Sequence, residues 1–97
     1  EVRCEGHTDD LDLPEAAEYL SNWELSSARS LSFVRLLSTY ADMPQRLFSA
    51  MGYGEFRPIV DIAQLKNKEQ INEARAQNRR VEIYLDAFLK NKTEFNI

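Results

Sequence analysis

The protein has 97 residues, with 12 Lys and Arg against 16 Asp and Glu, which gives a net charge of -4 at pH 7. A chain of this length forms one domain, close to the lower size limit for a working hydrophobic core. With 43% hydrophobic and 29% charged residues, its composition is that of a globular protein rather than of a disordered tail. The excess of acidic residues argues against a nucleic-acid-binding protein, whose affinity rests on excess positive charge.

Membrane spans and cysteine-based sites are also disfavoured. The sequence has no run of about 18 apolar residues, so we expect no membrane-spanning segment within it. Cys4 is the only cysteine, which excludes an internal disulfide and a zinc site built from several cysteines. On the inward side of a strand, Cys4 would serve as a small apolar core residue.

The first predicted element is a strand over residues 1–6. Val2, Cys4 and Gly6 alternate there with charged residues, a period of two that is typical of a strand with one side turned to the core. Because the strand begins without a turn or a cap, we expect an upstream part of the fold to precede it. A polar loop over 7–14 and a short helical turn over 15–20 are predicted to follow.

A long helix is predicted to begin at Ser21 and to run to about residue 41 or 42. Ser21 and Glu24 have the spacing of a capping box, and Leu20 with Leu25 has that of a hydrophobic staple. Pro44 ends the helix because proline lacks an amide hydrogen and clashes with the preceding turn. At about 100° per residue, the apolar residues of the helix predict one broad face turned to the core. That face consists of Phe33, Leu36, Leu37, Tyr40 and Ala41.

The rest of the chain predicts two more strands and one shorter helix. A strand over 47–53 follows the proline turn, and an irregular connection leads to a polar helix over 68–78. The clearest strand covers 80–85, where apolar and polar residues alternate. The polar segment 90–97 is predicted to be a loose tail.

The order strand, helix, strand, helix, strand predicts an α+β fold with helices against one face of a sheet. The domain is expected to span residues 1–88, with a polar tail over 89–97. Three strands with no helix before the first would leave an exposed sheet edge, which again points to missing upstream sequence.

Arg29 is the first candidate functional residue, because it lies on the apolar arc of the long helix near its N-terminal end. A guanidinium in that position is costly unless an anion meets it. Two interpretations remain open. Arg29 either forms an internal salt bridge or reaches solvent, or it binds a ligand carboxylate with its planar fork, helped by the helix N-terminus.

The loop at Thr8 and Asp9 follows a strand, which is a common place for ligand-contacting residues. Asp9 could accept a hydrogen bond from a ligand ammonium, with Thr8 donating or accepting beside it. Together with Arg29 it would suit a zwitterionic group. The competing interpretation is an Asx-turn at Asp9 that only shapes the loop.

Catalytic and metal chemistry are weakly indicated. His7 is the only histidine and has neither a nucleophilic serine in a strand-to-helix elbow nor a glycine-rich phosphate loop beside it, so a packing role is favoured over acid–base catalysis. Asp9, Asp10 and Asp12 could attract a divalent ion, but they lack the glycine and terminal glutamate of a calcium loop. We therefore expect no cofactor and no metal.

A basic stretch occurs where the second helix passes into the last strand. Such a cluster is usually a solvated helix end. Arg79 and Arg80, however, lie at the change from helix to strand, so their side chains should point to different faces. We expect at least one of them to line a cleft.

These pieces together resemble the OmpA-like peptidoglycan-binding domain. Four motifs in matching order carry the resemblance, which covers about residues 1–87. They are Glu5-Gly6-His7-Thr8-Asp9, Asn22-Trp23-Glu24-Leu25-Ser26-Ser27-Ala28-Arg29, Gly52-Tyr53-Gly54-Glu55 with Arg57-Pro58, and Arg75-Ala76-Gln77-Asn78-Arg79-Arg80-Val81-Glu82-Ile83. Ser30 stands where alanine is common, a mild change at a site compatible with the surface.

Within the family, the sequence is most similar to the flagellar-motor stator B subunits and their sodium-driven relatives. The segment Ser21-Asn22-Trp23-Glu24-Leu25-Ser26, the pair Asp9-Asp10 followed by Pro14, and the long gap between Asp9 and Asn22 are typical of that branch. The resemblance implies a two-layer sandwich with a mixed sheet and helices on one face, here lacking the family's first strand and helix.

The resemblance also implies a ligand and its contacts. The family binds the peptide stem of peptidoglycan, chiefly its diamino acid, without cleaving it. By motif position, Asp9 would meet the ligand's amino group and Arg29 its carboxylate. Thr8, Asn22 and Leu25 would supply neighbouring contacts, and Arg79 would close the pocket.

The implied function is non-catalytic anchoring of a stator complex to the cell wall. It implies a periplasmic domain of a protein held in the bacterial inner membrane. The resemblance also implies that this protein is a homodimer and that it binds a stator A subunit through an N-terminal transmembrane segment outside this sequence. A competing hypothesis is a general tether between the outer membrane and peptidoglycan, of the OmpA or peptidoglycan-associated lipoprotein type. Two further hypotheses are a hydrolase that uses His7 and Asp9, and a fragment without ligand affinity.

Overall fold

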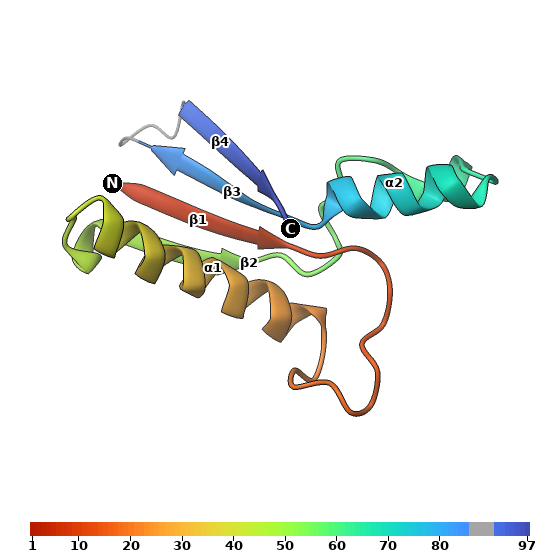
Figure 1. Ribbon diagram of the computed structural model, residues 1–97, viewed down its shortest axis with the longest axis horizontal. Coiled ribbons are helices and arrows are strands. Elements are labelled where there is room, and N and C mark those ends of the chain that lie inside the picture. The colour runs from red at the N-terminus through yellow and green to blue at the C-terminus, as the bar shows by residue number, and fades with distance from the viewer. Residues whose placement is uncertain (86–90) are drawn as a thin grey trace.

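A computed structural model of the chain describes residues 1–85 and 91–97. It contains strands β1 (Val2–His7), β2 (Phe48–Gly52), β3 (Arg80–Leu85) and β4 (Asn91–Asn96), and helices α1 (Asn22–Tyr40) and α2 (Lys68–Asn78) (Figure 1). Two short 3-10 turns, Gln45–Leu47 and Ile62–Gln64, precede β2 and α2. In the described ranges, neither helix has the length and apolar character needed to cross a membrane.

The four strands form one mixed sheet in the order β2-β1-β3-β4. β1 runs parallel to β2 and antiparallel to β3, and β4 runs antiparallel to β3. Cys4 at the centre of β1 lies opposite Ala50 on one side and Ile83 on the other. The predicted α+β fold with a mixed sheet is confirmed. Of the two helices, α1 lies along one face of the sheet and α2 extends beyond its end (Figure 1).

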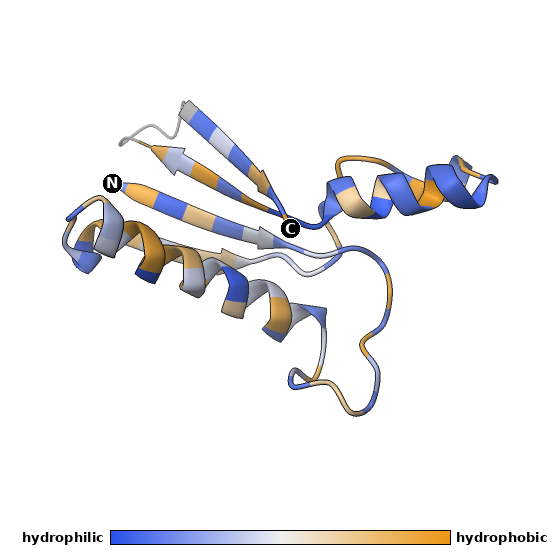
Figure 2. Cartoon of the chain, viewed as in Figure 1, coloured by the Kyte–Doolittle hydropathy of each residue, from blue (hydrophilic) through white to orange (hydrophobic). Residues whose placement is uncertain are grey.

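The hydrophobic core lies between α1 and the central strands. Its buried members are Val2, Cys4, Val81 and Ile83, and the partly buried residues packed against them are Phe33, Val34, Leu37, Met43 and Phe48. Only part of the predicted helix face is therefore buried. Leu36 and Tyr40 are 47% and 81% exposed. The buried residues of α1 are instead Ser26 and Ser30, and hydrophilic and hydrophobic residues alternate along this helix (Figure 2).

Small residues allow the N-terminal half of α1 to lie directly on the sheet. A Cβ atom at Gly6 would lie 2.0 Å from the carbonyl oxygen of Ser26. Ser26 and Ser30 are completely buried, so the expectation that Ser30 occupies a surface-compatible site is wrong. The hydroxyl of Ser26 accepts a hydrogen bond from the Gly54 amide at 2.9 Å. This close approach brings the start of α1 next to the end of β1.

The ends of α1 follow the predicted signals in part. Ser21 caps the helix by accepting a hydrogen bond from the Trp23 amide at 3.1 Å, and its hydroxyl also contacts the Glu24 carboxylate. The helix ends before Pro44, as predicted. The hydrophobic staple is wrong, because Leu20 is 92% exposed. The predicted helical turn over 15–20 is reduced to one turn closed by the Ala17 amide on the Pro14 carbonyl.

The polar C-terminal segment is a strand, not the predicted loose tail. In β4, Phe95 pairs with Val81 and Thr93 with Ile83. The Phe95 ring lies 5.5 Å from that of Phe33 on α1. The alternation of polar residues with Thr93 and Phe95 suits an edge strand with one side against the core. The predicted domain end at residue 88 lies outside the described residues.

Candidate ligand-binding site

Three segments meet where β1 ends. They are the loop after β1, the first two turns of α1, and the junction between α2 and β3. Together they enclose a cavity of about 220 Å³. All six residues that the sequence singled out line it, namely Thr8, Asp9, Asn22, Leu25, Arg29 and Arg79, together with Leu11, Asp12 and Leu13.

Hydrogen bonds to backbone groups hold the loop after β1 in place. The Thr8 amide donates to the Gly54 carbonyl at 2.9 Å, and the Thr8 hydroxyl donates to the Asp9 carbonyl at 2.9 Å. Oδ1 of Asp9 accepts from the Leu11 amide at 3.0 Å, which forms the Asx-turn that the sequence left open. Nδ2 of Asn22 donates to the Leu11 carbonyl at 3.0 Å and so ties the loop to α1.

The second oxygen of Asp9 faces a guanidinium. Oδ2 lies 3.0 Å from Nη1 of Arg79, and the exposed fractions of the two side chains are 12% and 37%. Nε of Arg79 also donates to the Ile97 carbonyl at 3.1 Å. Asp9 therefore both shapes the loop and contributes a nearly buried carboxylate to the wall of the cavity.

Arg29 contributes a second guanidinium with unused hydrogen-bonding capacity. Its Nη1 is buried and has no hydrogen-bond partner among the residues that the structure describes. Burial lowers the pKa of Arg29, and the nearby charge of Arg79 lowers it further, whereas Asp9 raises it. A buried donor without a partner is costly. The lining holds two guanidiniums, Arg29 and Arg79, and two carboxylates, Asp9 and Asp12. Because Arg79 is paired with Asp9, Arg29 is the cation whose free donor an anionic group would satisfy.

The two arginines at the start of β3 turn to different sides, as expected. Arg79 lines the cavity, whereas Arg80 is buried in an ion pair with Glu82 at 2.6 Å and donates to the Arg57 carbonyl. Asn78 before them accepts from the amides of Ile59 and Val60 and holds the preceding connection in place. Arg79 is thus the ligand-facing member of this basic stretch.

Two carboxylates of the acidic loop, Asp9 and Asp10, pair with arginines. Asp10 points away from the cavity toward α2, where it accepts two hydrogen bonds from Arg75 at 2.8 and 3.3 Å. The Arg75 side chain lowers the pKa of Asp10 through these bonds. Because arginines occupy the carboxylates of Asp9 and Asp10, these groups are engaged in holding the loop rather than gathered around a common point.

His7 lies outside the cavity, in a polar cluster on the sheet face opposite α1. Its ring stacks on Tyr53 at 5.2 Å, and burial together with the charge of Arg80 lowers its pKa to about 4. Its ligand atoms and those of Glu5 and Glu82 lie within 4.8 Å of one another. No motif in the sequence marks this trio, although Glu5 and His7 fall on the same side of a period-two strand. Arg3 and Arg80 pair with the two carboxylates.

Sequence reasoning also missed the apolar and acidic members of the wall. Leu11, Asp12 and Leu13 lie in a loop without periodicity, so no pattern marks the direction of their side chains. The available sequence signal was that these three residues lie between Thr8 and Asn22, two of the predicted site residues.

A mixed sheet covered by one long helix, with a charged cavity where the strand ends and the helix starts, defines a small α+β binding domain with the OmpA-like fold. The chain is 39% identical over 80 residues to Motility protein B of Bacillus subtilis, covering 82% of this chain. Its structure matches the C-terminal domain of Helicobacter pylori MotB with a TM-score of 0.70 and 29% identity, over 91% of this chain and 61% of that one.

A third relative comes from a different machine. The cell wall anchor of the T6SS from Pseudomonas aeruginosa matches with a TM-score of 0.62 and 38% identity, over 86% of this chain and 52% of that one. No protein-family model matches the chain. The chain spans only 28% of the length of Motility protein B. Because the 39% identity to Motility protein B extends over 82% of the chain, the chain belongs to the MotB family. It shares the fold of the C-terminal periplasmic domain of MotB proteins.

Proposed function

We propose that this domain binds the peptide stem of peptidoglycan, without cleaving it, by gripping the zwitterionic end of the stem's diamino acid. The observation that carries the proposal is the buried, unpartnered Nη1 of Arg29 in the same cavity as the Asp9 carboxylate. A ligand carboxylate would supply the acceptor that Arg29 lacks among the described residues. The ligand ammonium would bind Asp9 in place of, or together with, Arg79.

The remaining wall residues have roles that fit this ligand. Leu25 would pack against the methylene groups of the diamino acid. Thr8 and Asn22 line the cavity with a hydroxyl and an amide, and Arg79 would close over the bound group from the end of α2. Binding of this kind needs no nucleophile and no general base, so the proposed function is that of an anchor and not of an enzyme.

The biological role proposed is anchoring of a flagellar stator to the cell wall, by similarity to the MotB proteins. The domain would lie in the periplasm, in a protein held in the inner membrane through a segment outside this sequence. That segment would bind the stator A subunit. Two B subunits together would convert modest affinity for each stem into firm attachment, because the second binding event becomes intramolecular.

A second candidate is a general tether to peptidoglycan that serves no motor. The similarity to the T6SS cell wall anchor favours it, because that protein has 38% identity to this chain and belongs to another machine. The two candidates share the ligand and differ in what precedes the domain. A transmembrane helix upstream would support the stator, whereas a lipidated cysteine would support an outer-membrane tether.

Co-sedimentation with purified sacculi tests the proposed binding. Asp9→Asn keeps an oxygen to accept from the Leu11 amide but removes the charge, so we expect the chain to stay folded and to lose most of its sacculus binding. Asp10→Asn is the matched control, because Asp10 lies next in sequence but outside the cavity, and its binding should equal that of the original chain. Equal binding by both variants would overturn the proposal, and release of soluble muropeptides would show an enzyme instead.

A further inference from the structure

Three ionisable side chains on the sheet face opposite α1 form a group that the proposed function does not use. Glu5 and His7 belong to β1, and Glu82 lies on β3 directly opposite Glu5. One ligand atom from each of the three lies within 4.8 Å of the other two. The side chains of Glu5, His7 and Glu82 are 8%, 4% and 7% exposed, so the group is held inside the protein.

The imidazole of His7 has unused ligand capacity. Both of its ring nitrogens are buried and have no hydrogen-bond partner among the residues that the structure describes. Its Nε2 lies 3.9 Å from Oε1 of Glu5, which is beyond hydrogen-bond reach. Two ligand atoms that lie about 2.1 Å from one metal ion at a tetrahedral angle are about 3.4 Å apart. The separation of these two atoms is therefore close to the span that one ion bridges.

The two glutamates keep carboxylate oxygens that can bind a cation. Like charges directly opposite one another on neighbouring strands destabilise a sheet, and an arginine offsets each of these charges at one oxygen only. Arg3 lies 2.7 Å from Oε2 of Glu5, and Arg80 lies 2.6 Å from Oε2 of Glu82. Oε1 of Glu82 accepts from the Tyr84 hydroxyl at 2.7 Å. Since a carboxylate offers about four lone-pair sites, both Oε1 atoms retain the capacity to bind an ion.

We infer that Glu5, His7 and Glu82 form a binding site for a divalent transition-metal ion, with Zn²⁺ as the best match. One imidazole nitrogen and two carboxylate oxygens are ligands that zinc accepts, with water in a fourth position. Mg²⁺ and Ca²⁺ prefer oxygen ligands throughout. The ion would supply the partner that His7 lacks, and it would join β1 to β3 next to Thr8. This inference replaces the expectation of no metal that was drawn from the sequence.

The two arginines differ in how easily an ion would displace them. Arg80 is buried and also donates to the carbonyls of Asn78 and Arg57, so other groups than Glu82 hold it. Arg3 has a 31% exposed side chain, and its Nε forms no hydrogen bond to a described residue although it lies close to Glu5. A long side chain of this kind can turn its charged end to solvent. Arg3 is therefore the cation with which a bound metal would compete.

Calorimetric titration of Zn²⁺ into the whole, metal-free chain tests the inference. The original chain should bind one Zn²⁺ and should not bind Mg²⁺ at the same concentrations. His7→Phe keeps a ring to stack on Tyr53 and removes both nitrogens, so it should lose zinc binding. Arg3→Met should bind zinc more tightly, because the competing cation is gone. Glu73→Gln is the matched control, since Glu73 is an exposed glutamate on α2, and its zinc binding should equal that of the original chain.

A second measurement needs no variant. His7 is the only histidine of the chain, so its ring signals in nuclear magnetic resonance spectra report on this site alone and should shift in step with added zinc. Zinc binding that leaves these signals unmoved, or that survives in His7→Phe, would overturn the inference. Absence of zinc binding to the original chain would overturn it as well. The gain expected for Arg3→Met guards against a folding defect, because a damaged fold would not bind zinc more tightly.

Discussion

Replacement of Arg29 by methionine should move ligand binding and folding stability in opposite directions. Methionine keeps an unbranched, flexible side chain and removes the guanidinium. In the structure that guanidinium has a buried Nη1 without a partner among the described residues, and Arg79 is the nearby charge that opposes it. A guanidinium positioned to bind a ligand should be unfavourable for folding and favourable for binding.

The expected gain in stability follows from the buried donor. One buried hydrogen-bonding group without a partner costs about 1–3 kcal/mol. Arg29 as a whole is only partly buried, so we take the lower end of that range. The free energy of unfolding of Arg29→Met should rise by about 1 kcal/mol, or roughly 4–8 °C in melting temperature for a domain of this size.

The expected loss in binding is larger. Truncating one member of a buried, hydrogen-bonded charge pair costs about 2–5 kcal/mol. For a ligand carboxylate held by Arg29, the lower part of that range, about 2–3 kcal/mol, corresponds to a roughly 30- to 150-fold larger dissociation constant.

Two measurements on the same protein preparation check this prediction. Urea unfolding without ligand gives the change in stability, and titration with stem peptide gives the change in affinity. Lys in place of Arg29 provides a control, since it keeps the charge and loses the planar fork. A less stable Arg29→Met that still binds the peptide would refute the reasoning, because Arg29 would then be a structural residue.

Three further changes probe the surrounding structure. Arg79→Met should lower the free energy of unfolding by about 1–3 kcal/mol in urea titrations, because it leaves the nearly buried Asp9 carboxylate without its 3.0 Å partner. Gly6→Ala should destabilise the fold by about 3 kcal/mol or more in the same assay, since its Cβ would meet the Ser26 carbonyl at 2.0 Å. The pKa of His7 is about 4 in the folded chain against 6.5 for the free side chain. The contribution of neutral His7 to the free energy of unfolding is therefore complete above pH 6.5 and is lost as the pH falls toward 4. His7→Phe should therefore lose about 3 kcal/mol less stability than the original chain between these pH values.

Each of these changes has an outcome that would contradict its reason. A stabilised Arg79→Met would mean that the ion pair with Asp9 does not hold the loop. An unchanged Gly6→Ala would mean that α1 can shift away from β1 at little cost. Parallel pH profiles for His7→Phe and the original chain would show that His7 is hydrated in the folded state.

Local signals in the sequence were sufficient to predict most of the helices and strands. The Ser21 cap and Pro44 bound α1, and period-two alternation marks β1 and β3. The predicted helix over 68–78 matches α2 because Asn67 caps its start, accepting from the amides of Glu69 and Gln70. These signals depend on neighbouring residues only, which is why a single sequence carries them.

Features that depend on distant contacts were predicted less well. β4 is polar, and it becomes a strand because β3 offers an edge for pairing and Phe33 on α1 packs against Phe95. The face of α1 was misplaced because apolar residues such as Leu36 and Tyr40 outweigh Ser26 and Ser30 in any hydropathy pattern. Close packing of Ser26 on Gly6, together with the core contacts of Phe33, Val34 and Leu37, decides which side of the helix meets the sheet.

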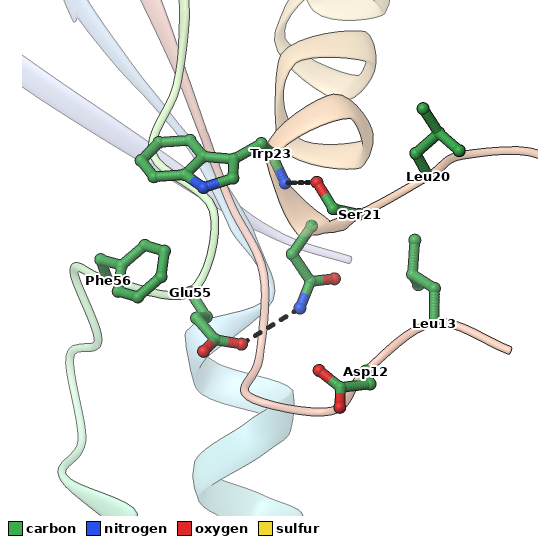
Figure 3. Close-up of a pocket in the computed structure, with 8 residues that line it drawn as sticks. Asp12, Leu13, Leu20, Ser21, Trp23, Glu55 and Phe56 are labelled. Atoms are coloured by element: carbon green, nitrogen blue, oxygen red, sulfur yellow. Dashed lines mark hydrogen bonds between the residues drawn. The ribbon is translucent and has the colours of Figure 1, made fainter.

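In the candidate site too, the features that depend on local sequence were predicted and those that depend on distant contacts were not. An arginine on an otherwise apolar arc and an aspartate after a strand are visible in the sequence, and both line the cavity. The ion pair between Asp9 and Arg79 joins positions 70 residues apart and could not be derived from spacing. The contact between the Trp23 and Phe56 rings, whose centroids lie 5.2 Å apart, likewise joins α1 to the loop after β2 (Figure 3).

The most direct test of the account is a chemical cycle on the ligand carboxylate. Stem peptides with a free and with an amidated carboxylate on the diamino acid are titrated into the original chain and into Arg29→Met. The account predicts that amidation weakens binding to the original chain strongly and has no further effect on the variant. Equal affinity of the original chain for both peptides would contradict the claim that Arg29 and Asp9 grip a zwitterion.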